Sequence, residues 1–192
     1  FPEESALLSF WSDKLGTPAN DLKDLPDGRG MTDLIRAKTM KQGGAGYVKP
    51  DSGSFPNMAE MNKFVLQCGA LPTMAWLDGC SAGEEAIEEL IEVGRSTGVV
   101  VFNIIPDRNF TPGSKDQKLA NLQRVIEIIQ DLGMPLLAGT EMNSPGQKFV
   151  DDFDSDELKP FHDQFLAGSR ILHAHSTLQR YAGMGYLSDW AK

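Results

Sequence analysis

The sequence predicts an α/β protein made of parallel βα units, and within that class the C-terminal half of a TIM-like barrel. Short strands that are apolar on both faces alternate with helices, which is typical of a parallel sheet covered by helices. The expected strands start at residues 45, 71, 99 and 135, and this spacing of 26, 28 and 36 residues suits βα units.

Two helices are expected before the first unit. Residues 5–15 form an amphipathic pattern that ends at Gly16. Thr32 can cap a second helix over residues 33–42. The chain begins at Phe1 rather than at Met and enters a helical pattern at once, so we expect a preceding segment in the gene product.

The βα units are defined by apolar runs and by glycines that end helices. The expected strands cover residues 45–48, 71–77, 99–105 and 135–140, and the expected helices cover 57–68, 82–96 and 115–132. Four strands are too few for a closed barrel, whose usual length is about 250 residues. An open doubly wound sheet usually has a Gly-rich loop after its first strand, whereas the glycines at 43–46 precede a strand. Half a barrel is therefore preferred.

Residues 1–192 are expected to form a single α/β domain, a fragment of a larger barrel. Residues 1–44 are the helical lead-in, 45–155 hold the βα units, and 156–192 are a mainly helical tail. Within the tail, residues 170–173 fit either a short strand or the continuation of a helix.

Composition excludes several classes of partner. The net charge of −9 argues against nucleic acid and against an anionic membrane surface, because both are bound through clustered Lys and Arg. No apolar run approaches the roughly 20 residues that a spanning helix needs. Only two cysteines occur, Cys68 and Cys80, which fits a reduced, cytoplasmic compartment.

Polar residues follow each expected strand, at the end where parallel sheets and barrels bind their ligands. These candidates are Lys49 with Asp51, Asp78, Asp107 with Arg108, Glu141 with Asn143, and His173 with His175. Each also has a plain structural explanation. Asp78 fits a turn before Gly79, the loop at Asp107 can be solvated, and Lys49 can pair with Asp51 on the surface.

His173 and His175 can share a metal only if they lie on a strand, where residues two apart point the same way. In a helix their directions differ by about 200°. Cys80 stands near an expected helix start, which can lower the pKa of a thiol. The acidic run at residues 84–92 is interleaved with apolar residues and is expected to be the solvated face of a helix.

Residues 135–146 resemble the last metal-binding strand of the polymerase-and-histidinol-phosphatase (PHP) family. That strand typically reads apolar, then Gly-Ser-Asp-Ala-His, often followed by Ser-Pro. Here Thr140 stands for the Ser, Glu141 for the metal-binding Asp and Asn143 for the metal-binding His. Glu can still bind a metal, whereas Asn is a weaker ligand than imidazole.

The resemblance implies a barrel with divalent metal ions, Mn, Zn or Mg, at its strand ends. It implies hydrolysis of a phosphate ester or a related bond in a small anionic substrate by metal-activated water. Related amidohydrolase barrels carry a His-x-His on their first strand, which would lie before Phe1.

We therefore expect a metal-dependent hydrolase of the PHP or amidohydrolase type. Glu141 and Asn143, with His173 and His175, are the candidate metal ligands. The candidate catalytic residues are Asp78 and Asp107, as secondary ligands or proton-transfer groups, and Lys49 and Arg108, which would hold the anionic group of the substrate.

Two other functions stay open. A sugar isomerase or aldolase-type barrel uses the same residue types, and Trp76 could stack on a sugar ring. A degenerate, non-catalytic barrel would bind a ligand without turnover, which the Asn at position 143 favours. Because half a barrel exposes sheet edges, we expect a dimer or association with a missing N-terminal segment.

Glu141 carries the sharpest geometric expectation. It is the first charged residue after a buried apolar strand, so its carboxylate should lie at the rim of the sheet. An ionised carboxylate there is costly unless it meets a cation. We expect it to contact a metal, a water cluster or a basic side chain such as Lys49 or Arg108.

Overall fold

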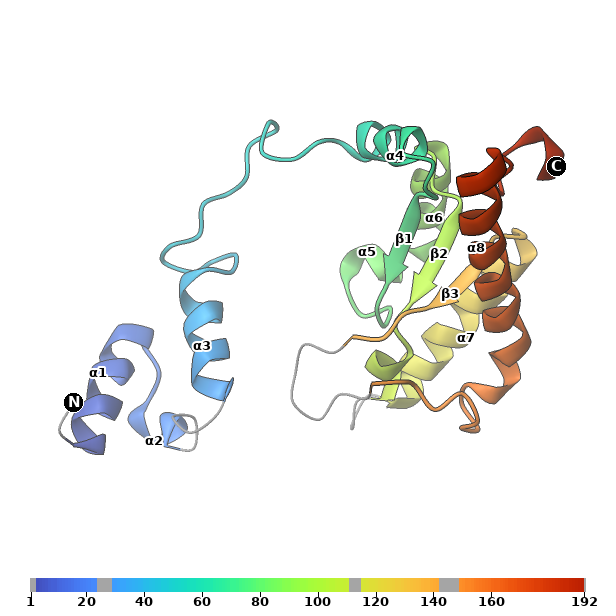
Figure 1. The fold of residues 1–192 in the computed structure, drawn as a ribbon. Coiled ribbons are helices and arrows are strands. Elements are labelled where there is room, and N and C mark those ends of the chain that lie inside the picture. The colour runs from blue at the N-terminus through green and yellow to red at the C-terminus, as the bar shows by residue number, and fades with distance from the viewer. Residues whose placement is uncertain (1–2, 24–28, 111–114, 142–148, 192) are drawn as a thin grey trace. The chain divides into compact units, whose positions relative to one another are not determined.

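The computed structural model describes residues 3–23, 29–110, 115–141 and 149–191, and Figure 1 shows its ribbon. The chain divides into two compact units, Phe1–Phe55 and Pro56–Lys192. Each unit has its own hydrophobic cluster and is described separately.

The first unit is helical. Its helices are α1 (Glu4–Leu15), α2 (Ala19–Leu22) and α3 (Arg29–Thr39). Their apolar side chains meet in one small core, made of Leu8, Leu15, Leu22 and Met31. Helix α1 ends as predicted at Gly16, whose φ of 58° is the left-handed conformation that favours glycine. The second predicted helix starts earlier than expected, so Thr32 lies inside α3 and does not cap it.

The predicted strand over residues 45–48 is wrong. This segment consists of turns and irregular chain, and Val48 is largely exposed. An apolar run forms a strand only when a neighbouring strand satisfies its backbone groups, and no described strand pairs with this one. The glycines at positions 43, 44 and 46 favour turns instead.

The second unit holds a small, open, parallel sheet with the order β1-β2-β3. Its elements are α4 (Met58–Gln67), β1 (Thr73–Trp76), α5 (Ala82–Glu85), α6 (Ile87–Ser96), β2 (Val101–Ile104), η1 (Pro106–Phe110), α7 (Lys115–Asp131), β3 (Leu136–Ala138), η2 (Lys159–Phe161), α8 (His162–Ala182) and η3 (Asp189–Ala191). Three predicted strands and the helices between them are thus confirmed. The predicted helix over 82–96 is divided at Ala86, whose ψ of 53° is not helical.

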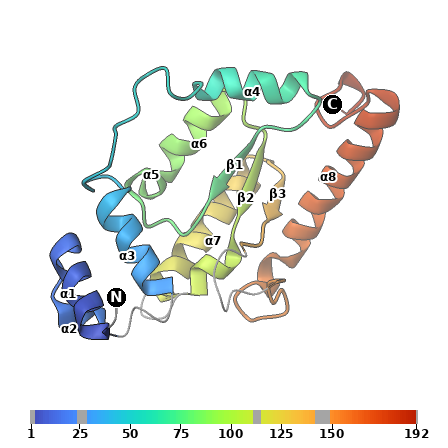
Figure 2. The same cartoon turned by 60° about the vertical axis from the view of Figure 1, so that its left-hand side comes forward.

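The two faces of the sheet differ. Trp76, Phe102 and Ile104 point towards α6 and α7 and pack in the main core with apolar residues of those helices. Figures 1 and 2 show both helices along this face. On the opposite face Thr73 and Ala75 are exposed. The two crossover helices α6 and α7 share one face, as expected for sequential βα crossovers of a single hand, whereas Val101 on the opposite face is buried.

Helix α8 packs along β3. Gly168 allows this close approach, because a Cβ atom there would lie 1.8 Å from the Leu136 carbonyl oxygen. Residues 170–173, for which the sequence left strand and helix open, are helical, since α8 runs through them. The buried residues Phe165, Gly168 and His175 recur at helical spacing. One side of the helix is therefore buried, which favours a helix over a strand in this stretch. Within the described part, no helix has the length and apolarity to cross a membrane.

Candidate active site at the carboxyl edge of the sheet

The carboxyl ends of β1, β2 and β3 lie at one edge of the sheet, since the strands are parallel and adjacent. Asn109 of η1 joins the first two strand ends. Its buried amide donates hydrogen bonds to the carbonyls of Leu77 and Ile105, both at 3.2 Å. This tie fixes η1, and with it Arg108, against the end of β1.

Asp78 lies two residues beyond β1 and forms an ion pair with Lys118 of α7, with 2.9 Å between Oδ2 and Nζ. Their side chains are 17% and 11% exposed. Burial acts to raise the pKa of Asp78, but the hydrogen bonds from Lys118 and the Cys80 amide and the charge of Lys118 outweigh it. The pKa of Asp78 therefore lies below its ordinary value of 3.8, and the carboxylate is ionised at neutral pH.

Glu141 lies beyond β3 and pairs with Arg108, whose Nε donates to Oε2 at 2.5 Å. The Glu141 side chain is 20% exposed and that of Arg108 is 40% exposed, so the pair stands at the rim. The hydrogen bond from Arg108 to Glu141 raises the pKa of the guanidinium. The expectation that Glu141 meets a basic side chain at the rim is confirmed, with Arg108 as the partner.

Lys118 connects the two pairs. Its ammonium also donates a hydrogen bond to the Arg108 carbonyl oxygen at 3.4 Å. The result is a row of alternating charge along the carboxyl edge, in the order Asp78, Lys118, Arg108, Glu141. We call these four residues the charged row. Such a row holds its two cations in fixed positions at a partly buried edge, where charge interactions are stronger than in bulk water.

Further polar side chains stand next to the charged row. Thr140 donates a hydrogen bond of 3.4 Å to Oδ2 of buried Asp151. At Gly139 a Cβ atom would lie 2.9 Å from Nδ2 of Asn103, so glycine lets this half-buried amide reach the end of β3. The candidate site therefore contains neutral hydrogen-bonding groups beside its charges.

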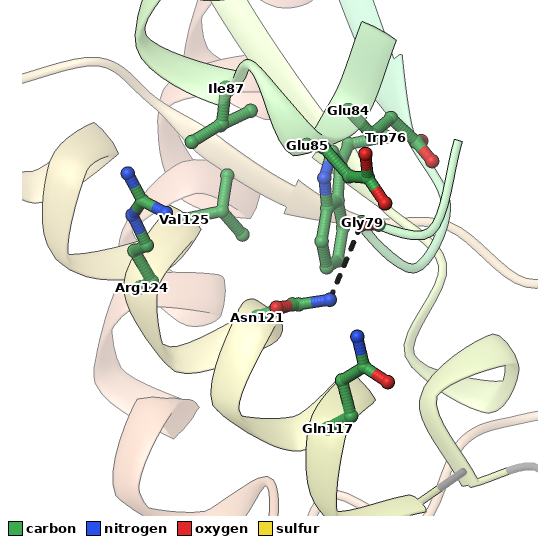
Figure 3. A pocket seen from close by; sticks show the side chains of 9 residues that line it. All are labelled: Trp76, Gly79, Glu84, Glu85, Ile87, Gln117, Asn121, Arg124 and Val125. Atoms are coloured by element: carbon green, nitrogen blue, oxygen red, sulfur yellow. Dashed lines mark hydrogen bonds between the residues drawn. The ribbon is translucent and has the colours of Figure 1, made fainter. Parts of the chain in front are cut away.

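A pocket of about 150 Å³ lies on the helix-covered side of β1. Figure 3 shows the Trp76 ring extending towards Asn121 of α7, with Gln117 and Arg124 on the same helix. Asn121 donates to the Gly79 carbonyl oxygen at 3.3 Å. Trp76 is 1% exposed and belongs to the core, so its ring does not stand open at the rim, where the isomerase alternative would need it to stack on a sugar.

His173 and His175 lie on α8 and do not share a strand. His173 is exposed, whereas His175 is buried and uses both ring nitrogens in hydrogen bonds to backbone groups. Since residues two apart on a helix point in different directions, the geometric condition for a shared metal is not met.

Three other candidates keep the status of predictions. Asn143 and the side chain of Asp107 lie outside the described residues. Lys49 belongs to the first unit, where it is exposed in an irregular segment, as is Asp51. Asp51 accepts hydrogen bonds from Gly53 and Ser54 within its own loop.

The described residues do not by themselves fit a divalent metal. No group of three His, Cys, Asp or Glu side chains with metal-binding geometry occurs among them. Asp78 and Glu141 instead form ion pairs with Lys118 and Arg108, respectively. The positive charge of each partner opposes the binding of a cation to the same carboxylate.

Cys80 is not an activated thiol. Desolvation and the negative charge of Asp78 raise the pKa of Cys80, so the lowering that a helix start can cause does not occur. Cys68 and Cys80 are both free and exposed.

Sequence reasoning missed Lys118 and Asp151. Lys118 had a detectable signal, because it stands four residues before Leu122 in the buried stripe of α7 that continues with Val125, Ile126 and Ile129. A lysine within an apolar stripe indicates a buried acidic partner. Asp151 had no such signal, since its burial depends on how the segment after β3 folds back.

Comparison of the chain with protein-family models, with curated proteins and with solved structures gives no match.

Proposed function

We propose that this chain is part of a barrel hydrolase of the PHP or amidohydrolase type that acts on a small anionic substrate such as a phosphate ester. The observation that carries this proposal is the charged row at the carboxyl edge of three parallel strands. Ligands of parallel β/α folds bind at this edge, where loops from successive strands meet.

Arg108 is the residue proposed to hold the anionic group. Its position is fixed by Glu141 at its Nε and by the tie between Asn109 and Leu77, and its side chain reaches solvent. A guanidinium presents donors in a planar fork that matches phosphate and carboxylate oxygens. Glu141 acts in this proposal as the residue that orients Arg108. Asp78 acts in it as the residue that holds the Lys118 ammonium, which donates to the Arg108 carbonyl oxygen.

The metal dependence of this hydrolase class stays a prediction, because the described carboxylates are paired with cations. Metal analysis of the purified chain, followed by addition of Mn²⁺, Zn²⁺ or Mg²⁺, tests it directly. A bound divalent ion, or activity that depends on an added one, supports the prediction. No bound ion and no effect of added metal would remove the metal from the proposal.

A panel of phosphate monoesters and diesters, assayed for phosphate or alcohol release, tests the hydrolase itself. Replacing Arg108 by Gln should raise KM by roughly tenfold or more, because a charge-assisted hydrogen bond to the substrate is lost. Arg124→Gln is the matched control, since Arg124 is an ion-paired arginine on α7 outside the charged row. Equal losses in both variants, or no turnover of any ester with any metal, would refute the proposal.

A second candidate, a ligand-binding barrel without catalysis, is favoured by one observation. Asp78 and Glu141 are already paired with basic side chains, which suits binding of an anion better than activation of water. The same panel separates the two functions. Binding of an ester that weakens in Arg108→Gln, without turnover, supports the second candidate.

The barrel architecture is part of the proposal. The parallel strands, their sequential order and the crossover helices α6 and α7 on one face suit a segment of a barrel wall. Further strands would then come from a second copy or from another segment. Light scattering should give a mass above 21.0 kDa, whereas a compact, stable monomer of 21.0 kDa would oppose this architecture.

A further inference from the structure

The indole N–H of Trp76 is a buried donor that has no acceptor in the described part of the chain. Trp76 is 1% exposed, and its ring forms part of the wall of the pocket of about 150 Å³ beside α7. Figure 3 shows the ring nitrogen on the side that faces Ile87 and Val125, which also line this pocket. We call this hollow the Trp76 pocket. An N–H that is kept from water without an acceptor is costly, so a ligand that brings an acceptor to this point gains free energy.

The amide of Asn121 adds an acceptor to the wall of the Trp76 pocket. Its Nδ2 donates to the carbonyl oxygens of Asp78 and Gly79, at 3.2 and 3.3 Å. Gly79 permits this contact, because a Cβ atom there would lie 2.7 Å from Nδ2. Since the amide nitrogen is engaged with the backbone, Oδ1 is the atom of Asn121 that remains to accept a hydrogen bond from a ligand.

Two carboxylates line the Trp76 pocket, and they are used differently. Glu84 accepts hydrogen bonds from the Leu77 amide at 2.7 Å and from the Ser81 hydroxyl at 3.0 Å, so it belongs to the turn after β1. Glu85 is exposed and has no hydrogen bond or ion pair with any described residue. Figure 3 shows its carboxylate extending over the Trp76 ring. Nε1 lies just below the pocket surface, so rotation of the exposed Glu85 side chain would let a ligand atom reach it.

The cationic side chain of the lining is already engaged. Arg124 forms an ion pair with Glu88 of α6, which does not line the Trp76 pocket. The charge of Arg124 is therefore balanced from outside, whereas that of Glu85 is left for a ligand. The pocket thus offers one buried donor, Trp76 Nε1, against a majority of acceptors and one uncompensated negative charge.

We propose that the Trp76 pocket binds a small primary ammonium compound that carries a carbonyl oxygen. The carbonyl oxygen accepts from Trp76 Nε1, and the ammonium donates to Glu85 and to Oδ1 of Asn121. An ammonium has three donors and no acceptor, so it matches this wall. A cavity of this volume holds benzene, which limits the ligand to about six heavy atoms. No side chain of the charged row is used, so the site stands whether or not Arg108 binds an ester.

Nuclear magnetic resonance of the labelled full chain tests the site through its indole N–H signals. The chain has three tryptophans, of which Trp76 alone is buried. Glycinamide is the probe, at about pH 6.5, where its amino group is charged. The Trp76 indole proton should move downfield and saturate with a Kd of about 1 to 10 mM, as suits so small a ligand. No saturable shift up to about 50 mM would overturn the proposal.

A matched ligand isolates the ammonium. Glycolamide has the same carbonyl and a hydroxyl in place of the ammonium, so it should bind at least about tenfold more weakly than glycinamide. Equal affinity for the two ligands would show that Glu85 does not select a cation, and would overturn the proposal.

Matched variants isolate the carboxylate. Glu85→Gln should raise the Kd of glycinamide by about tenfold or more, because a charge-assisted hydrogen bond is lost. Glu89→Gln removes the same charge from an exposed site outside the pocket and should leave the Kd unchanged. Arg108→Gln should also leave it unchanged, which separates this site from the charged row. Equal losses in Glu85→Gln and Glu89→Gln, or loss in Arg108→Gln alone, would refute the assignment.

Discussion

The two ends of the sheet in the second unit are held together by different chemistry. At the carboxyl end, partly buried ion pairs join Asp78 to Lys118 and Arg108 to Glu141. At the amino end, hydrogen bonds to backbone carbonyls join the elements instead. Asn62 donates to the Thr97 carbonyl oxygen at 3.0 Å, and the His175 ring contacts the Gly69 carbonyl oxygen. Fixed charge is therefore concentrated at the carboxyl edge of the sheet, where it could stabilise a bound ionic ligand.

The largest expected effect concerns the contact that brings α8 to the sheet. Gly168→Ala should destabilise the protein by about 3 kcal/mol, because the new Cβ atom meets the Leu136 backbone and forces α8 away from β3. The free energy of unfolding in urea measures this. The amino end should loosen with it, since α8 carries His175.

Gly83→Ala is the control for that substitution. Gly83 also lies in a helix, but nothing lies within 4 Å of its ideal Cβ position. Alanine there should be neutral or should stabilise by up to about 1 kcal/mol. If Gly168→Ala behaved like Gly83→Ala, the close packing of α8 on β3 would be wrong.

The second prediction removes one cation from the charged row. Lys118→Met leaves the Asp78 carboxylate partly buried without its ammonium partner and should cost about 2 kcal/mol at neutral pH. The pKa of Asp78 is lowered in the folded protein, so the pair stabilises the fold fully above the ordinary value of 3.8. This contribution is lost as the pH falls through the lower folded-state pKa. The difference between parent and variant should therefore shrink in acid.

Lys115→Met provides the comparison for Lys118. Lys115 pairs with Glu157 in a more exposed setting, and such pairs contribute only about 0 to 1 kcal/mol. Denaturation curves at neutral and acidic pH should show a larger pH-dependent difference for Lys118→Met than for Lys115→Met, although Lys115 also lowers the pKa of its partner Glu157. A penalty of the same size and pH dependence in both would contradict the special position of Lys118.

Glu141→Gln removes the ion-pair partner of Arg108 but should have only a small effect on the free energy of unfolding. The pair is at the rim, so the expected cost is about 1 kcal/mol, and high salt should reduce it. Glu89→Gln, an exposed acid of α6, controls for the change in net charge. An equal cost in both variants, unaffected by salt, would indicate that Arg108 does not depend on Glu141.

The smallest expected effect belongs to the ion pair of Glu88 with Arg124. Both side chains are 58% exposed, so Glu88→Gln should change the free energy of unfolding by less than about 0.5 kcal/mol. Thermal unfolding is sufficient to check this. A change as large as that for Lys118→Met would remove the contrast between surface pairs and the charged row.

The sequence predicted those parts of the fold that local patterns determine. The strands near 71–77, 99–105 and 135–140 could be found because each is a short apolar run that stands between two helices. Residues 45–48 form a similar apolar run, but no strand of the described sheet pairs with them. Whether an apolar run finds a neighbouring strand depends on the tertiary fold. The stretch around His173 fitted both a strand and a helix, and the burial of Phe165, Gly168 and His175 on one side of α8 decides between them.

The candidate site could be predicted as a location but not as a set of contacts. Placing Glu141 at the rim required only that a charge follow a buried strand. Its pairing with Arg108 depends on the adjacency of β2 and β3, and the pairing of Asp78 depends on the register of α7 against β1. Such registers are set by packing across the whole core and have no short sequence signal.

The central claim is that the carboxyl edge binds a small anionic ester through Arg108. A titration of the isotopically labelled chain with phenyl phosphate, followed by amide chemical shifts, tests it most directly. The account predicts shifts at the amides around Asp78, Arg108 and Glu141, their loss in Arg108→Gln and their persistence in Arg124→Gln. Shifts that gather at the amino end of the sheet, or that survive unchanged in Arg108→Gln, would contradict it.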